Sequence, residues 1–310
     1  GIGYQAGQSA AVNDIVAIGY RAGQTTTGAA NTFIGRDAGF QNDAEANNVY
    51  VGYHAGRNLN ARENVAIGAY ALEGNGSNLA AWRSIAIGYQ ALKSITTGDN
   101  NVAIGLKAGD SMSTGASCVI IGDEADAAGT ADNQIAIGDA TVTDGANKIR
   151  LGNSSIGTAN IQVSWTVDSD QRIKENIQDS QLGLDFINAL SPKTFTKKHP
   201  ADWDEAIRED RYKKGYVSID PETGEEIIES TRYYNAETNT PIKDEFDSTT
   251  VHDGLIAQEV KAAADSLGVN FSGWYEAVNG KQGIQYETLV MPLIKAIQEL
   301  SAKVEALENK

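Results

Sequence analysis

The chain has little material for disulfides, metal ligands or a membrane span. Its single cysteine, Cys118, excludes an internal disulfide framework, and the apolar run CVIIG around it predicts a small buried side chain rather than a nucleophile. The three histidines, His54, His199 and His252, lie far apart and lack the spacing of metal ligands, so we expect no metal. No apolar run approaches the roughly 18 residues of a membrane-spanning helix, so we expect no membrane insertion.

Positive charge is also scarce. The 310 residues contain 25 Lys and Arg against 41 Asp and Glu, which gives a net charge of −16. Proteins that bind nucleic acids concentrate Lys and Arg on one surface, so we expect no nucleic-acid partner. The opening phrase GIGYQAG begins in mid-pattern and does not resemble a signal peptide, so we expect the chain to be a fragment of a longer one.

Glycine, in contrast, is abundant and regularly placed. Short phrases such as VAIGYRAG, TFIGRDAG, VYVGYHAG and VAIGLKAG recur through the first half at intervals of about 16 to 17 residues, which is typical of a repeat architecture. GIGYQAG could be mistaken for a dinucleotide-binding fingerprint, but the phrase recurs and no helix-period segment follows it, so no cofactor is expected. The recurring glycines are Gly3, Gly19, Gly35, Gly52, Gly68, Gly88, Gly105, Gly122, Gly138 and Gly152.

One repeat unit reads as one coil of a β-solenoid. In the phrase NVAIG, Val65 and Ile67 share one face and small residues such as Ala66 share the other, an alternation that predicts a strand. A second short piece, Y-x-A-G or Y-x-A-L, and a polar turn complete the unit, so we expect two short strands and two turns per coil. Units this short bury no core alone and must stack on one another and against neighbouring chains. The glycine after each strand would supply a positive φ or space at a corner.

The recurring phrase VAIGxxA resembles the head repeats of trimeric autotransporter adhesins, which are left-handed parallel β-rolls assembled as trimers. The resemblance covers about residues 1–153 and implies a homotrimer, but it implies no particular ligand. We therefore expect residues 1–168 to be a repetitive, trimeric, all-β solenoid that forms a fibre segment.

The second half has a different character, with helix-period patterns from Val167 onward. An apolar stripe over residues 182–190, ended by Ser191-Pro192, predicts a helix, and HDGLIAQEVKAAADSLG predicts a short strand or turn leading into a helix that Gly268 ends. Residues 200–250 form a strongly acidic insertion, which we interpret as a solvated excursion rather than a cation site, and YVSIDPETGEEIIES within it predicts a hairpin.

The C-terminal residues 286–310 carry a heptad stripe typical of a coiled-coil helix. We expect the regular coil to begin near Pro292, because proline lacks the N–H that a helix interior requires. The stripe consists of Tyr286, Val290, Leu293, Ile297, Leu300, Val304 and Leu307.

Four phrases in series, SDQRIKENI, GLDFINALSPKTF, HDGLIAQEV and YETLVMPLIKAIQEL, resemble the endosialidase-type C-terminal intramolecular chaperone domain of bacteriophage tail fibres and tailspikes. The resemblance covers about residues 168–310. It implies that residues 169–310 form an α+β chaperone and autoprotease domain, which guides trimer assembly and then releases itself.

The resemblance also implies the site residues. Cleavage falls between Asp168 and Ser169, with Ser169 as the nucleophile and Lys174 in the place of the dyad lysine. A serine hydroxyl needs an adjacent base, and a lysine acts as one only where burial or a nearby cation, here Arg172, favours its neutral form. Asp170, as a cap or backbone anchor, and His252, near the dyad, are further candidates for support.

These expectations together describe the C-terminal part of a phage tail fibre or tailspike. Its location would be the virion, its partner a bacterial surface receptor such as a polysaccharide or an outer-membrane component, and its chaperone would be released in the host cytoplasm during assembly. Two alternatives stay open. A bacterial trimeric adhesin would need a C-terminal membrane anchor after the heptads, and a polysaccharide-degrading tailspike would need a spaced carboxylate pair. Acids in the repeats, such as Asp37, Asp110 and Asp123, are scattered among the turns without a recurring pair.

Overall fold

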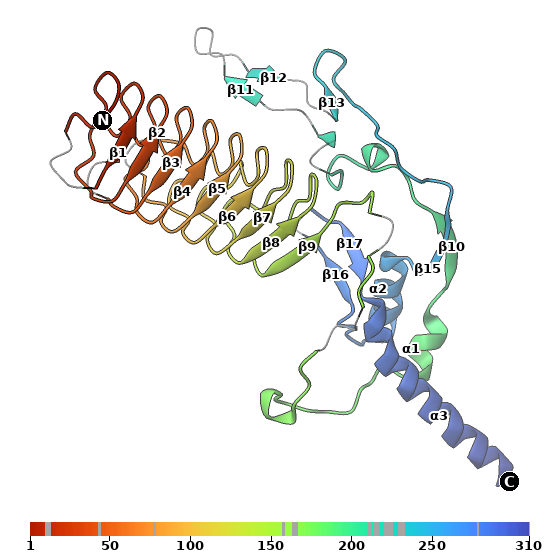
Figure 1. Ribbon diagram of the computed structural model, residues 1–310. Helices are drawn as coiled ribbons and strands as arrows, with labels where there is room; N and C mark the ends of the chain where they lie inside the picture. Colours follow the sequence, from red (N-terminus) through yellow and green to blue (C-terminus); the bar gives the residue numbers. More distant parts are fainter. Residues whose placement is uncertain are drawn as a thin grey trace. The chain divides into compact units, whose positions relative to one another are not determined.

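The computed structural model divides the chain into two compact units, Gly1–Ile156 and Gly157–Lys310 (Figure 1). It describes residues 1–9, 14–42, 45–76, 79–156, 159–162, 167–209, 212–213, 217–219, 226–228, 233–277 and 279–309. The functional boundary that the sequence predicts between residues 168 and 169 stays a prediction. Each unit is described by itself.

The N-terminal unit is a parallel β-solenoid, as the repeats predict. Its nine strands form one sheet in the order of the sequence, and they lie in one continuous file from red to yellow-green in Figure 1. Neighbouring coils pair at equivalent repeat positions, for example Ala66 with Ala86 and Ile67 with Ile87. The strands are β1 (Val16–Ile18), β2 (Thr32–Ile34), β3 (Val49–Val51), β4 (Val65–Ile67), β5 (Ile85–Ile87), β6 (Val102–Ile104), β7 (Val119–Ile121), β8 (Gln134–Ile137) and β9 (Lys148–Leu151).

The expectation of a second strand in every coil is wrong. The Y-x-A-G pieces form turns, because Arg21 and its equivalents adopt positive φ values, 54° at Arg21, which bend the chain out of the extended conformation. The turns still bond from coil to coil, since the Arg21 N–H donates to the Tyr4 carbonyl at 2.8 Å. Within the described residues, an isolated parallel bridge forms beyond the main strands at Leu59–Leu79 and at Asp126–Val142.

The central residue of each strand points into the coil, and it is alanine in several strands but Phe33 in β2, Tyr50 in β3 and Ile120 in β7. The central alanines of the strands, such as Ala66 and Ala103, are fully buried, whereas several Val and Ile side chains that flank them are between 37 % and 45 % exposed. At the corner, a Cβ on Gly68 would lie 2.5 Å from the carbonyl oxygen of Gly88, and the φ of Gly68 is 132°. Only glycine fits this position, since both the space and the dihedral angle exclude a side chain.

A buried ladder of polar side chains holds successive coils in register. The Asn48 side-chain oxygen accepts the Asn64 backbone N–H at 3.0 Å, and the Asn64 oxygen accepts the Ser84 N–H at 2.8 Å. The ladder continues through Ser84 to Asn101 and from Asn101 to Cys118. Each rung satisfies a backbone donor that no water reaches. Cys118 is buried, as its apolar surroundings predict.

The C-terminal unit is built from short helices and hairpins around a small core. Phe186 and Phe271 pack with their ring centroids 5.3 Å apart, and Val260 and Ala264 complete the buried cluster. The helix that the sequence predicts within HDGLIAQEVKAAADSLG is present over Ala257–Ser266, and Gly268 follows it with a φ of 66°. The elements are α1 (Leu184–Ala189), β10 (Lys193–Thr196) paired antiparallel with β15 (Val251–Gly254), α2 (Ala257–Ser266), and the hairpin of β16 (Trp274–Glu276) and β17 (Gln282–Ile284).

The acidic insertion contains its predicted hairpin, in which β11 (Val217–Ile219) pairs antiparallel with β12 (Glu226–Ile228). The turn that was predicted between these strands lies outside the described residues. A second short pair, β13 (Tyr234–Asn235) and β14 (Thr240–Pro241), follows. The 3-10 helix η2 (Pro200–Asp202) contributes Ala201 to a small buried cluster with Tyr212 and Tyr233, so the described part of the insertion has a core of its own.

The C-terminal helix α3 (Val290–Glu308) follows the 3-10 helix η4 (Tyr286–Leu289). It begins two positions before the expected start. Pro292 lies in its first turn, where backbone N–H groups have no partner inside the helix. The heptad stripe is exposed along its length in the single chain.

Candidate active site

A short turn follows the predicted cleavage position. Residues Gln171–Ile173 form the 3-10 helix η1, and the Asp170 carboxylate caps it by accepting the Arg172 backbone N–H at 2.9 Å. Lys174 ends the turn, with its N–H donating to the Gln171 carbonyl at 3.1 Å. Because the turn is tight, it folds the side chain of Lys174 back toward the residues before the cap.

The turn brings together the two residues that the sequence predicts as a dyad. Lys174 Nζ lies 2.6 Å from Ser169 Oγ and donates a hydrogen bond to it. In this state the ammonium group is the donor. For base catalysis the proton must leave the lysine, so that its amine accepts the proton of the serine hydroxyl at the same contact.

Asp170 and Arg172 form an ion pair beside the dyad. Arg172 Nη2 lies 2.6 Å from Asp170 Oδ2, and the hydrogen bonds from the Arg172 side chain and backbone hold the pKa of the Asp170 carboxyl below its usual range. The positive charge of Arg172, which was expected to favour the neutral form of Lys174, is therefore paired with the Asp170 carboxylate in the single chain. Asp170 acts here as a cap and as the partner of Arg172.

The segment that holds the dyad is exposed in the single chain. Ser169 and Lys174 both face solvent, and the apolar side chains around them are also uncovered: Val167 is 82 % exposed, Ile173 66 % and Ile177 62 %. These isoleucines were not singled out in the sequence. The sequence did contain a signal for them, because Ile173 and Ile177 are isolated apolar residues in a charged run. A turn that stays in solvent does not need apolar side chains.

His252 lies elsewhere in the C-terminal unit. It is on β15, opposite Phe195 of β10, with the two rings 6.0 Å apart. Within the described part of the chain, no hydrogen bond or ion pair joins His252 to Ser169 or Lys174. Four of the predicted residues thus form two contacting pairs, Ser169 with Lys174 and Asp170 with Arg172. His252 takes part in neither of these contacts.

Across the described ranges, no group of three or more His, Cys, Asp or Glu side chains is arranged to hold a metal ion. Of the helices described, none has both the length and the apolar composition that crossing a membrane requires.

Comparison with known families gives a match to the segment that begins at Ser169. Residues 169–217 match the family model Peptidase_S74, described as the chaperone of endosialidase. The match begins at Ser169, contains Lys174 and extends into the acidic insertion. No match was found among curated proteins or among solved structures.

Proposed function

Because the chain carries an endosialidase-type chaperone domain, we propose that it is the C-terminal part of a phage tail fibre or tailspike that cleaves itself between Asp168 and Ser169. The family implies self-cleaving peptidase activity in general, and its chaperone indicates a protein of the tail-fibre or tailspike type. The observation that carries the finer proposal is the 2.6 Å contact between Lys174 Nζ and Ser169 Oγ at the first residue of the family match.

The proposed reaction begins with Ser169 Oγ attacking the carbonyl carbon of Asp168 while the neutral Lys174 amine takes the hydroxyl proton. The bond from the Asp168 carbonyl carbon to the Ser169 nitrogen breaks, and Lys174 returns a proton to the leaving amine. The acyl group then lies on Ser169 Oγ as an ester. Water hydrolyses the ester, which gives a carboxylate on Asp168 and restores the serine hydroxyl.

Assembly would switch the dyad on. In the single chain both side chains are exposed to solvent. Burial of Lys174 between copies would favour the neutral amine. The uncovered side chains of Val167, Ile173 and Ile177 supply apolar area for that burial, which supports an interface at this segment.

The partner we propose is a second and a third copy of the chain. On the solenoid, the outward Val and Ile side chains of successive strands form an exposed apolar row, with Ile18, Ile67 and Ile137 among them. Rows of this kind on a soluble protein mark interaction surfaces. Three parallel copies would cover identical rows at once.

The C-terminal helix supports the same assembly. Its exposed heptad stripe matches the pattern of a coiled coil. Beside it lies an apolar groove of about 400 Å³ between α1, β15 and the start of α3, lined by Ile187, Leu190, Pro192, Leu255, Leu289 and Leu293. Apolar side chains of a neighbouring copy would fill this groove.

A chaperone at the C-terminal end of the solenoid would help three repetitive chains to align in the correct register. Slipping one solenoid past another by a single coil restores nearly the same contacts, so the register is weakly specified. A globular end that trimerises first would fix the stagger of the three chains and raise their local concentration. After assembly, release of the guide would leave a fibre protected by a high unfolding barrier.

The remaining parts of the proposal concern the biological setting. The solenoid would be a fibre segment of the virion that attaches to a bacterial surface receptor, a polysaccharide or an outer-membrane component. The released chaperone would stay in the host cytoplasm during assembly. No cofactor takes part in the proposed reaction.

Denaturing mass spectrometry of the expressed chain tests the chemistry. We expect two fragments, split between Asp168 and Ser169, and a single intact species for Ser169→Ala and for Lys174→Ala. Light scattering coupled to size-exclusion chromatography measures the number of copies in the same samples. An assembled trimer of the wild-type chain that stays intact would disprove the self-cleavage, and a stable monomer would disprove the threefold state.

A further inference from the structure

Aromatic rings and a guanidinium form a continuous row along the first coils of the solenoid. The rings of Tyr4 and Tyr20 stack with centroids 5.4 Å apart, and the Arg36 guanidinium lies 5.5 Å from the Tyr20 ring and 5.8 Å from the Tyr53 ring. The Tyr53 and Tyr70 rings are 5.2 Å apart, and those of Tyr70 and Tyr89 are 5.9 Å apart. We call this row the tyrosine–arginine strip: Tyr4, Tyr20, Arg36, Tyr53, Tyr70 and Tyr89.

The fold does not require these residues. The strip residues other than Tyr70 each follow a corner glycine directly, and the equivalent positions in later coils hold Leu106, Asp123 and Asp139. The corner therefore accepts residues of very different chemistry. Yet Tyr4, Tyr20, Tyr53 and Tyr89 are between 38 % and 65 % exposed. Exposed aromatic rings that a fold does not need are typical of a binding surface.

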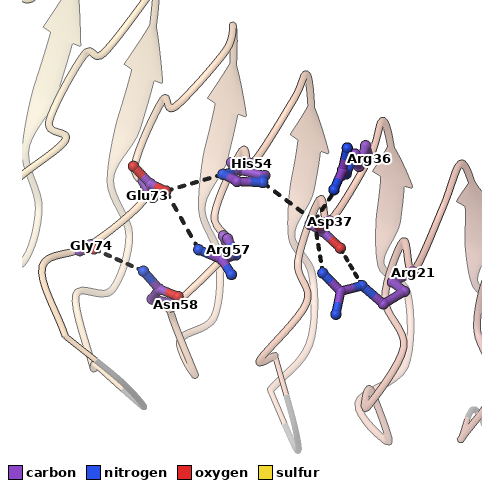
Figure 2. A network of polar contacts seen from close by, with 8 residues as sticks. All are labelled: Arg21, Arg36, Asp37, His54, Arg57, Asn58, Glu73 and Gly74. Carbon is purple, nitrogen blue, oxygen red and sulfur yellow. Dashed lines mark hydrogen bonds and ion pairs between the residues drawn. The ribbon is translucent and has the colours of Figure 1, made fainter. Parts of the chain in front are cut away.

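The carboxylate of Asp37 contacts Arg36 of the strip and the neighbouring Arg21 and His54, as Figure 2 shows. Asp37 is only 1 % exposed, and it accepts two hydrogen bonds from the Arg21 guanidinium at 2.7 and 3.0 Å. Arg36 Nε lies 3.5 Å from the same carboxylate, and His54 Nε2 lies 3.3 Å from it. This ion pair restrains the Arg36 side chain, which stays 58 % exposed and open to a ligand.

The polar network is locally positive in a strongly acidic chain. Its other end is Glu73, which lies 3.3 Å from His54 Nδ1 and 4.0 Å from Arg57 Nη1 (Figure 2). Three guanidinium groups, those of Arg21, Arg36 and Arg57, thus face two carboxylates, while the whole chain carries a charge of −16. An anionic ligand would be attracted to this part of the surface more than elsewhere.

We propose that the tyrosine–arginine strip binds a carboxylate-bearing polysaccharide. The exposed parts of the tyrosine rings offer apolar surface and hydroxyl groups to sugar rings, and a guanidinium donates two parallel hydrogen bonds to a carboxylate. A row of platforms repeated from coil to coil fits a linear polymer better than a single small molecule. This inference rests on the proposed attachment of the fibre segment to a bacterial surface, and it names the chemical class of the receptor.

The test is titration of the full chain with polyglucuronate, polygalacturonate and alginate at about 0.15 M salt, where exposed charges are screened over roughly 8 Å. Carboxyl-reduced polyglucuronate is the neutral control with the same backbone, and polyglutamate is the control for charge without sugar rings. We expect binding of at least one acidic polysaccharide and weak or no binding of both controls. Arg36→Ala should weaken that binding at least about tenfold, which corresponds to the loss of one charge-assisted hydrogen bond. Tyr20→Ala removes an aromatic surface and should weaken binding by roughly two- to tenfold.

Leu106→Ala is the matched variant, because Leu106 occupies the same corner position in a later coil outside the strip. It should bind as tightly as the wild type. Absence of binding to all three acidic polysaccharides, equal binding of either control, or undiminished binding by Arg36→Ala and Tyr20→Ala would overturn the inference. So would loss of the trimer in these variants, which would assign the strip to the contact between copies. Self-cleavage and the number of copies, measured in the same preparations, report on the proposed function separately.

Discussion

The carboxylate of Glu299 on α3 accepts a hydrogen bond from the backbone N–H of Leu184, the first residue of α1, at 2.8 Å. The capping residue Gly183 has no side chain to satisfy this amide, and a Cβ there would lie 2.4 Å from Glu299 Oε1. A side chain 115 positions away in the sequence therefore performs the capping that a neighbouring residue usually performs. This contact ties α3 to the chaperone core.

Glu299→Ala removes this cap, and we expect it to lower the stability of the C-terminal unit by about 1 kcal/mol. Since the same contact orients α3, fewer chains should assemble at low concentration. Thermal unfolding and light scattering measure the two effects. Glu308→Ala, at the exposed end of α3, is the control and should behave as the wild type. Equal melting of both variants would contradict a role for the cap.

Lys174→Arg and Asp170→Ala separate the proposed base from its support. Arginine keeps the charge but does not give up its proton, so Lys174→Arg should slow self-cleavage at least about a hundredfold. Asp170→Ala removes the cap of η1 and should slow cleavage several-fold without abolishing it. The time course of fragment appearance gives both rates. Rapid cleavage by Lys174→Arg would show that Lys174 is not the base.

Gly68→Ala should destabilise the solenoid severely. The added Cβ would meet the Gly88 carbonyl oxygen at 2.5 Å, and the φ of 132° belongs to a region that is essentially restricted to glycine. We expect a cost of about 3 kcal/mol or more, seen as a lower thermal midpoint. At Gly145 the nearest atom to an added Cβ is 3.8 Å away. Gly145→Ala should therefore leave the midpoint nearly unchanged, and a similar loss in both variants would refute the steric argument.

Asp37 gives the solenoid a defined dependence on pH. Burial alone would raise the pKa of its carboxyl, but the hydrogen bond from Arg21 and the charges of Arg21, His54 and Arg57 outweigh burial and lower it. The stabilisation is therefore complete above the ordinary Asp pKa of about 3.9 and is lost as the pH falls through the lower pKa of the folded state.

Asp37→Asn removes this carboxylate and leaves the Arg21 guanidinium without its charged partner. Breaking a buried ion pair on one side costs about 3 kcal/mol, so the variant should melt well below the wild type at neutral pH. The difference between the two thermal midpoints should narrow as the pH falls below about 3.9, the ordinary pKa of Asp. The Asp37 carboxylate of the wild type then becomes protonated and loses the charge that the variant already lacks. Measuring the thermal midpoints of the wild type and of Asp37→Asn from about pH 2 to about pH 7 tests this dependence. A constant difference would mean that Asp37 stabilises the coil by shape alone.

Much of the architecture is readable from local patterns. The recurrence of Ile-Gly pairs predicts the solenoid, the heptad stripe predicts α3, and Gly268 marks the end of α2. The residue types of the dyad are also visible, because SDQRIKENI carries them within one short phrase. These features depend on neighbours within a few positions, and their periods are written directly in the chain.

Other features depend on where distant residues meet, and no local pattern contains them. Only the closed coil decides that the second piece of each repeat bends into turns, and that the central strand residues point inward while the flanking Val and Ile residues face outward. The burial of Asp37 beneath Arg21 and the capping of Leu184 by Glu299 likewise need coils or helices to stack. The amino-acid sequence by itself determined the repeat, its strands and the residue types at the dyad. The tertiary structure decided which faces are covered and which side chains touch, because burial and contact arise only when segments remote in the chain pack together.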